Sequence, residues 1–144
     1  MMMKTTYHGD IDCKNKQLIT FEKGLPGFLD ETEFVILPLP EADVFHVLQS
    51  TKTAELAFIV AEPFQFFPDY DFKLDDASVN QLQLQSGSDA AVYVVLTMSD
   101  HIEKITANLQ APILINTKTN LGKQVILNSE SYQTKHPLFQ LAKN

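Results

Sequence analysis

The chain has few of the residues that build metal and redox sites. Its one cysteine, Cys13, has no partner for a disulfide bond within the chain. Zinc sites need several cysteine or histidine ligands at short spacings, whereas the four histidines are far apart: His8, His46, His101 and His136. We therefore expect no metal site and no cofactor, and we expect each histidine to be an ordinary surface or core residue.

Long apolar runs are also missing. No stretch approaches the ~18 apolar residues of a membrane-spanning helix, and the first residues, MMMKTTYHGD, lack the apolar core of a signal peptide. There is no Asn-x-Ser/Thr glycosylation site, and a lone cysteine is typical of a reducing compartment. These features predict a cytoplasmic protein that does not enter a membrane.

Recognisable catalytic motifs are scarce. The Gly-x-Ser-x-Gly motif of serine hydrolases does not occur. Asp10/Asp12 and Asp69/Asp71 resemble paired carboxylates, but residues at i and i+2 of a strand share one face without defining a substrate cleft. The glycines of Gly24–Phe28 (GLPGF) predict a tight turn, because no Lys-Ser/Thr follows them as in a phosphate-binding loop. We therefore expect a protein that is not an enzyme.

Positive charge is sparse and dispersed. Eighteen acidic residues against eleven basic ones give a net charge of −7, and every basic residue is a lysine. Recognition of phosphates requires clustered lysine and arginine, so we expect no direct contact with nucleic acid. The acidic balance favours either a basic protein partner or simply solubility, and charge alone leaves both open.

Short apolar runs separated by turn residues predict a mainly β structure. We expect one domain over residues 1–144, since a chain of this length can bury a sufficient core. Strands are predicted at Lys4–Tyr7, Ile11–Cys13, Leu18–Phe21, Phe34–Leu39, Phe45–Gln49, Leu56–Ala61, Ala90–Met98, Ile105–Asn116 in two pieces, and Gln124–Leu127. The predicted fold is all-β, a compact antiparallel β-barrel-like domain with one or two short helices.

Several details of this prediction can be checked individually. Ile11–Cys13 is expected to form a hairpin with Leu18–Phe21, and Ile113–Asn116 one with Gln124–Leu127. The continuous apolar run Leu56–Ala61 predicts a strand buried on both faces. A helix of at most two turns should begin after Asp75 or Asp76.

The segment Glu62–Phe72, EPFQFFPDYDF, concentrates five aromatic residues between acidic ones. Pro63 and Pro68 exclude a regular helix through it. An extended segment would place Phe64 and Phe66 on one side and Phe67 on the other. Two interpretations stay open: a plug that closes one end of the β structure, or a binding surface.

Four blocks of the sequence, taken in their order along the chain, resemble the FliW family of flagellar assembly factors. They are Ile19–Phe28 (ITFEKGLPGF), Leu56–Phe72 (LAFIVAEPFQFFPDYDF), Thr106–Asn116 (TANLQAPILIN) and Gly122–Asn128 (GKQVILN), followed by the tail Tyr132–Pro137. The resemblance covers about Thr5 to Pro137. Cys13 and the glutamine-rich Gln81–Gln85 depart from the family pattern.

The resemblance implies a small cytoplasmic binding protein with a β-barrel-like fold. Proteins of this family are taken to bind flagellin and CsrA (carbon storage regulator), an RNA-binding repressor of translation. Bound to CsrA, they prevent it from silencing flagellin mRNA, and free flagellin competes for them. Synthesis of flagellin is thereby coupled to filament assembly.

We expect the partner-binding residues in two places, because aromatic anchors beside charges are typical of interface hot spots. The first group is Phe64, Phe67, Asp69, Tyr70 and Asp71, and the second is Asn108, Leu109, Gln110 and Pro112. The second group is expected to lie beside the first and to present polar groups at a bend; a buried bend is the alternative. Phe66 and Phe72 are assigned to the core.

A second function class stays open from the sequence alone. A small β-barrel that binds a ligand, or hydrolyses one in its mouth, would have a deep pocket lined by converging polar groups. A protein-binding module would instead show a shallow aromatic and acidic patch.

Overall fold

Strand β7 (Ala90–Thr97) is the longest strand and lies at the centre of the sheet, as its run of apolar residues predicts. The computed structural model describes residues 2–5, 9–12, 18–39, 44–85, 89–127 and 131–139. Its other strands are β1 (Met2–Lys4), β2 (Asp10–Asp12), β3 (Leu18–Thr20), β4 (Glu33–Pro38), β5 (His46–Ser50), β6 (Ala57–Ala61), β8 (Thr106–Ala107), β9 (Ile113–Asn116), β10 (Gly122–Gln124) and β11 (His136–Pro137). The helical elements are α1 (Asp76–Leu82) and the 3₁₀ turns η1 (Pro63–Gln65) and η3 (Ile102–Lys104).

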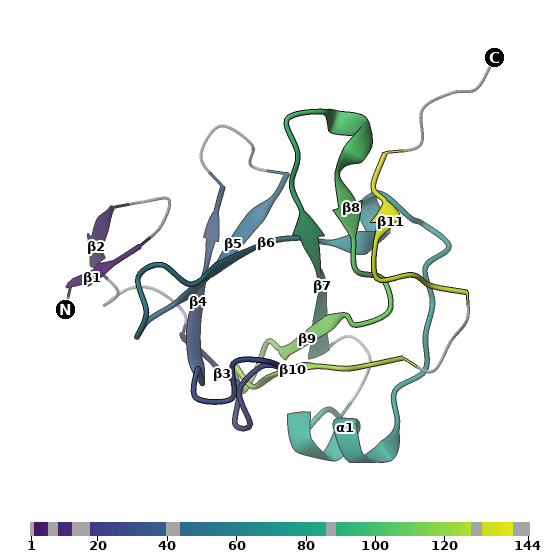
Figure 1. Cartoon of the computed structure of the whole chain (residues 1–144). Helices are drawn as coiled ribbons and strands as arrows, with labels where there is room; N and C mark the ends of the chain where they lie inside the picture. Colours follow the sequence, from purple (N-terminus) through teal and green to yellow (C-terminus); the bar gives the residue numbers. More distant parts are fainter. Residues whose placement is uncertain are drawn as a thin grey trace.

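The main sheet is antiparallel and curls around a common centre (Figure 1). Its strand order is β10-β9-β7-β6-β5-β4-β3, with β8 joined to β7 and β11 joined to β8. In the described ranges, one parallel bridge, between Thr20 and Leu121, joins the backbones of the two ends, where the Thr20 amide donates to the Asn120 carbonyl at 2.8 Å. The prediction of an all-β fold is confirmed, but the sheet is not a closed barrel.

The N-terminal strands pair differently from the prediction. β2 pairs with β1, and β3 pairs with β4 through Leu18–Val35, Ile19–Phe34 and Thr20–Glu33. The predicted hairpin between Ile11–Cys13 and Leu18–Phe21 is therefore wrong. The pairing with β4 buries Ile19 and Phe34 in one apolar cluster, which is a stronger constraint than closeness in the chain. Cys13 and the predicted turn 14–17 lie outside the described residues.

The predicted bend and the hairpin of Ile113–Asn116 are confirmed, but the partner strand lies earlier than the predicted Gln124–Leu127 and shares only Gln124 with it. β9 pairs with β10 through Ile115–Gly122 and Leu114–Lys123. β8 and β9 are the two apolar pieces of Ile105–Asn116, separated at Asn108–Pro112. Pro112 interrupts strand pairing there because it has no amide proton to donate.

The GLPGF turn depends on glycine most strictly at position 24. Gly24 has φ +70°, and a Cβ at this residue would lie 2.5 Å from the Leu29 carbonyl oxygen. The Phe28 amide donates to the Leu25 carbonyl at 2.7 Å and closes the turn. Any larger residue at position 24 would have to displace backbone, so the predicted tight turn is confirmed and explained.

Helix α1 begins after Asp75, as predicted, and spans two turns. It is held on the sheet by polar contacts: the Lys123 ammonium donates to the buried Ser78 hydroxyl at 3.0 Å, and the Asn116 side chain donates to the Leu82 carbonyl at 2.8 Å. The Ser78 hydroxyl beside it lowers the pKa of the Asp75 carboxyl. Within the described chain, the helices are too short and too polar to cross a bilayer.

Strand β6 differs from the prediction in its burial. Val60 and Ala61 are fully buried, whereas Ala57, Phe58 and Ile59 are only partly buried. The prediction of a strand buried on both faces is therefore wrong for the first three residues. Their exposure results from the sheet itself, because β7 covers only the last two residues of β6.

Candidate functional site

The segment 62–72 is not a simple extended strand. Glu62 has φ −77° and ψ 114° and is extended, as the following proline requires, but Pro63 then opens the 3₁₀ turn η1. Proline suits the first position of a helical turn because its missing amide proton would be unpaired there in any case. The predicted alternation of Phe64, Phe66 and Phe67 is therefore wrong.

Tyr70 belongs to the first predicted group of site residues and contacts the second group within the core. Its side chain is 5% exposed, and its hydroxyl donates to the Leu109 carbonyl at 2.6 Å. Burial, and to a smaller extent Tyr132, raises the pKa of Tyr70. The prediction that the second group lies beside the first is confirmed. Tyr70 itself is a core residue, and the little of it that is exposed lies in the wall of a shallow hollow.

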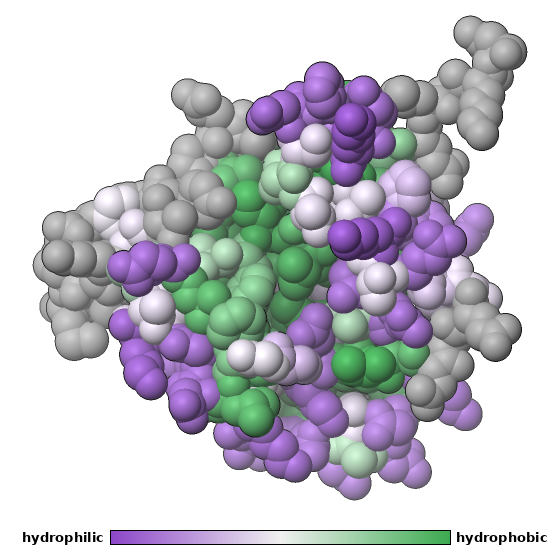
Figure 2. Space-filling view, in the orientation of Figure 1, coloured by the Kyte–Doolittle hydropathy of each residue, from purple (hydrophilic) through white to green (hydrophobic). Residues whose placement is uncertain are grey.

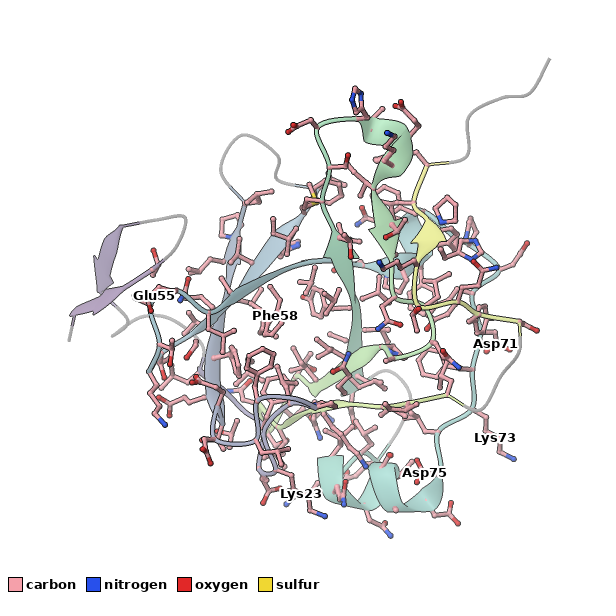
Figure 3. All side chains as sticks on the ribbon, viewed as in Figure 1. Lys23, Glu55, Phe58, Asp71, Lys73 and Asp75 are labelled. Carbon is pink, nitrogen blue, oxygen red and sulfur yellow. The ribbon has the colours of Figure 1, made fainter. Side chains whose placement is uncertain are left out.

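Tyr132 fixes the backbone beyond Tyr70. Its hydroxyl donates to the Asp71 carbonyl at 2.7 Å and accepts from the Asp71 amide at 2.9 Å. The two tyrosine rings stand edge to face with centroids 4.7 Å apart. Asp71 is thus held in place by its backbone while its carboxylate stays exposed (Figure 3).

The polar groups of the bend Asn108–Pro112 form hydrogen bonds within the bend and with the chain after β10. The Asn108 side-chain oxygen accepts from the amides of Gln110 and Ala111 at 3.2 and 3.1 Å. The carbonyls of Gln110 and Pro112 accept from residues 127 and 125 at 2.8 and 2.9 Å. The expectation that this bend presents backbone groups is wrong, because the chain after β10 pairs with them. Leu109 and Pro112 are buried, and Asn108 and Gln110 are half-buried.

Four residues of the first predicted group remain accessible, and we name them the aromatic–acidic rim: Phe64, Phe67, Asp69 and Asp71. Phe64 is 47% exposed, Asp69 and Asp71 are exposed, and Phe67 is half-buried. Pro68, Asp69 and Tyr132 help to line a shallow hollow of about 290 Å³. A partner-binding role of the rim is not tested by these positions and stays a prediction.

The core assignments of Phe66 and Phe72 agree with their packing. Both are partly buried against the cluster that contains Tyr70 and Leu109. The Phe66 ring lies 5.6 Å from the ring of Phe139. Phe66 and Phe72 therefore pack in the core, next in the chain to the rim residues Phe67 and Asp71.

Tyr132 and His136 belong to the same region but were not among the predicted site residues. The His136 ring meets Phe67 edge to face at 5.1 Å, and both tail residues line the hollow beside Tyr70. Sixty-one residues separate Tyr132 from Asp71, so no local pattern could indicate their contact. The only signal was that Tyr132–Pro137 closes the family resemblance.

The other titratable residues are dispersed over the described ranges. His46 packs against Tyr93 at 5.9 Å, and His101 is exposed beside Glu103. In the part of the chain that the structure describes, no three His, Cys, Asp or Glu side chains come together as a metal site. A hollow of about 470 Å³ lies between α1 and the stretch from β10 to Leu127, with Lys73, Ser78 and Lys123 in its wall.

Comparison with known proteins agrees with this architecture. The family model described as FliW protein matches residues 2–138. A protein of Geobacillus kaustophilus named flagellar assembly factor FliW is 50% identical over 139 residues, with 96% of each chain covered. The protein of the same name from Bacillus subtilis strain 168 is 49% identical over 138 residues, again with 96% of each chain covered.

A solved structure extends the similarity to the fold. The crystal structure of the flagellar assembly factor FliW superimposes with a TM-score of 0.92 at 48% sequence identity, covering 98% of this chain and 99% of that one. The described strands and the aromatic segment all lie within residues 2–138, which the family model matches. The chain belongs to the FliW family.

Proposed function

We propose that this protein is a cytoplasmic flagellar assembly factor that acts by binding proteins rather than by catalysis. Its partners in this proposal are flagellin and CsrA. When it holds CsrA, the repressor cannot silence flagellin mRNA; when free flagellin accumulates, flagellin occupies the factor and repression returns. Family membership over residues 2–138 supports the role in flagellar assembly.

The observation that carries the binding proposal is the aromatic–acidic rim. An exposed phenylalanine, Phe64, packs against Tyr70 with ring centroids 6.0 Å apart, and the exposed residues Asp69 and Asp71 flank Tyr70 in the chain. Aromatic anchors beside charges are enriched at interface hot spots. The hydrogen bonds of Tyr70 and Tyr132 hold this surface in place before a partner arrives, which lowers the entropic cost of binding.

The net charge of −7 favours a basic partner. Complementary charge speeds encounter between proteins, and the effect weakens as salt screens it. An RNA-binding repressor carries lysine and arginine for phosphate contacts. We therefore expect association with CsrA to be faster at low salt than at high salt.

Size-exclusion chromatography tests the proposal directly. The protein is mixed with purified flagellin, with purified CsrA, and with both, and each mixture is run beside the single components. We expect co-elution with each partner and displacement of CsrA when flagellin is in excess. If the protein elutes alone in all three mixtures at micromolar concentration, the proposal is wrong.

A further inference from the structure

The shallow hollow beside the aromatic–acidic rim is walled by rings. Its volume of about 290 Å³ lies just below the range of about 300–1,000 Å³ that is typical of sites for small-molecule ligands. A hollow of this size has room for one side chain of a protein partner. We name it the ring-lined hollow, after the residues whose rings form its wall: Phe66, Phe67, Tyr70, Tyr132 and His136.

The rings of this wall are held in place by contacts with one another. Phe67 and His136 meet edge to face with ring centroids 5.1 Å apart. Tyr70 and Tyr132 do the same with centroids 4.7 Å apart. The pairing of β11 with β8 sets His136 opposite Ala107 and fixes the tail of the chain against the sheet. The wall is therefore formed before a partner arrives, which lowers the entropic cost of binding.

Most hydrogen-bond donors of the wall already have acceptors within the chain. The Tyr70 hydroxyl donates to the Leu109 carbonyl, so its proton is not available to a ligand. The Tyr132 hydroxyl donates to the Asp71 carbonyl. The backbone amides of residues 66, 67, 70 and 109 also donate to carbonyls of the chain, and Pro68 has no amide proton. An anionic ligand needs such donors, so the ring-lined hollow does not suit one.

The carboxylate of Asp69 lines the hollow. Asp69 is exposed, and its carboxylate forms no hydrogen bond and no ion pair within the described ranges. Lys135 precedes His136 in the chain, but it is exposed and does not line the hollow. A cation that enters the hollow would therefore pair with Asp69 without breaking an existing ion pair among these residues.

Rings and a carboxylate together suit a guanidinium group. The face of an aromatic ring carries partial negative charge and attracts cations. A guanidinium is planar, stacks on rings and donates to carboxylates, whereas an ammonium is a compact and strongly hydrated charge. Figure 2 shows mainly hydrophilic surface over β11, at the right of this view, whereas apolar surface gathers over the centre of the ring of strands. A charged side chain near β11 would thus lie outside the large apolar area.

We propose that the ring-lined hollow binds an arginine side chain of a protein partner. The apolar stem of this arginine packs against Phe67 and Tyr132, and its guanidinium donates to the Asp69 carboxylate while its plane lies against the rings. The net charge of −7 favours a partner with such basic residues. The inference rests on the proposed function, because it names the group of the partner that the aromatic–acidic rim receives.

The test uses Nα-acetylarginine amide as a probe, at millimolar concentrations, in NMR titrations of the ¹⁵N-labelled protein. Nα-acetylcitrulline amide has nearly the same shape without the charge, and Nα-acetyllysine amide has the same charge without the plane. We expect the arginine compound to shift the amide signals of Phe67, Asp69 and Tyr132, and each control compound to bind at least about threefold more weakly. Equal binding of either control compound, or no shift with the arginine compound, overturns the proposal.

Variants of the protein locate the bound probe. Asp69→Asn should weaken binding of the arginine compound about threefold, to the level of the citrulline compound. Glu55→Gln is the matched control, because it removes another exposed carboxylate, on the opposite side of the molecule from Asp71 (Figure 3), and should leave binding unchanged. Phe67→Leu keeps an apolar side chain without a ring and should weaken binding about threefold. Native binding by folded Asp69→Asn, or an equal loss in Glu55→Gln, overturns the proposal.

If Phe67→Leu does not fold, the three compounds and the two carboxylate variants still decide the outcome. Size-exclusion chromatography then separates this inference from the proposed function. We expect Asp69→Asn to co-elute less with flagellin or CsrA than the native protein does, and native co-elution with both would overturn the inference. Normal co-elution of the native protein without any binding of the arginine compound overturns this inference alone. Selective binding of the arginine compound without co-elution with either protein overturns the proposed function alone.

Discussion

The substitution Tyr70→Phe separates the core of the candidate site from its surface. It removes one hydroxyl and leaves the ring in place. In the native protein this hydroxyl donates to the Leu109 carbonyl at 2.6 Å, and both residues are buried, at 5% and 1% exposure. The variant therefore leaves a buried carbonyl without its donor.

The expected loss of stability follows from that carbonyl. Leaving a buried acceptor unpaired costs about 1–3 kcal/mol. For a chain of this length the melting temperature changes by about 3 °C per kcal/mol, so we expect a decrease of about 3–9 °C. Binding of flagellin and CsrA by the folded variant should not change, because the hydroxyl points away from the aromatic–acidic rim.

Alkaline pH provides a second readout of the same hydroxyl. Burial raises the pKa of Tyr70 above the usual value for tyrosine. The folded state thus favours the neutral phenol. The stability that this preference contributes is fully present below the unfolded-state pKa of tyrosine, about 10, and is lost as pH rises through the raised folded-state pKa. Between about pH 9 and 11, the Tyr70→Phe variant should lose less stability than the native protein does.

Thermal unfolding followed by circular dichroism measures these effects. Tyr132→Phe is the matched control, because its hydroxyl bonds to the backbone of an exposed residue, where water can replace it. We expect this control to lose less stability than Tyr70→Phe. A melting temperature of Tyr70→Phe equal to that of the native protein would refute the assignment of Tyr70 to the core.

Two other predictions concern the turns of the sheet. Glu31 accepts hydrogen bonds from the hydroxyls of Ser50 and Thr53, which lower the pKa of its carboxyl. The stability that the ionised Glu31 contributes is present above its unfolded-state pKa and is lost as pH falls through the lowered folded-state pKa. Glu31→Gln should therefore reduce the pH dependence of the free energy of urea unfolding between about pH 5 and 3. Gly24→Ala should cost more than about 2 kcal/mol and Gly27→Ala about 1 kcal/mol, because both have positive φ but only the first Cβ meets backbone. Equal unfolding free energies for the two alanine variants would contradict the steric argument.

Elements set by continuous apolar runs could be predicted from the sequence. The run at Ala90–Met98 indicated a central strand, and β7 is one because its edges pair with β6, β8 and β9. Pairing of distant strands was harder. Nothing between Ile11 and Phe21 shows that Ile19 is buried beside Phe34, so the prediction that pairs it with the closest strand in the chain is wrong.

For the candidate site too, contacts between residues distant in the chain could not be predicted from the sequence. The carboxylates on either side of Tyr70 indicate a surface position. Its ring is buried instead, because the chain forms a 3₁₀ turn before it and its hydroxyl bonds to the Leu109 carbonyl in the core. Prolines correctly predicted the extended Glu62, but proline rules also permit the helical turn that follows it. Contacts across sixty residues, such as the one between Tyr132 and Asp71, leave no local trace in a single sequence.

The measurement that tests the central claim most directly is calorimetric titration of a rim variant. The variant combines Phe64→Ala, Asp69→Asn and Asp71→Asn, three exposed positions whose side chains carry little of the fold. We expect its melting temperature to stay within about 3 °C of the native value while its affinity for CsrA or flagellin falls more than about tenfold. Native affinity for both proteins in a folded variant would contradict the account.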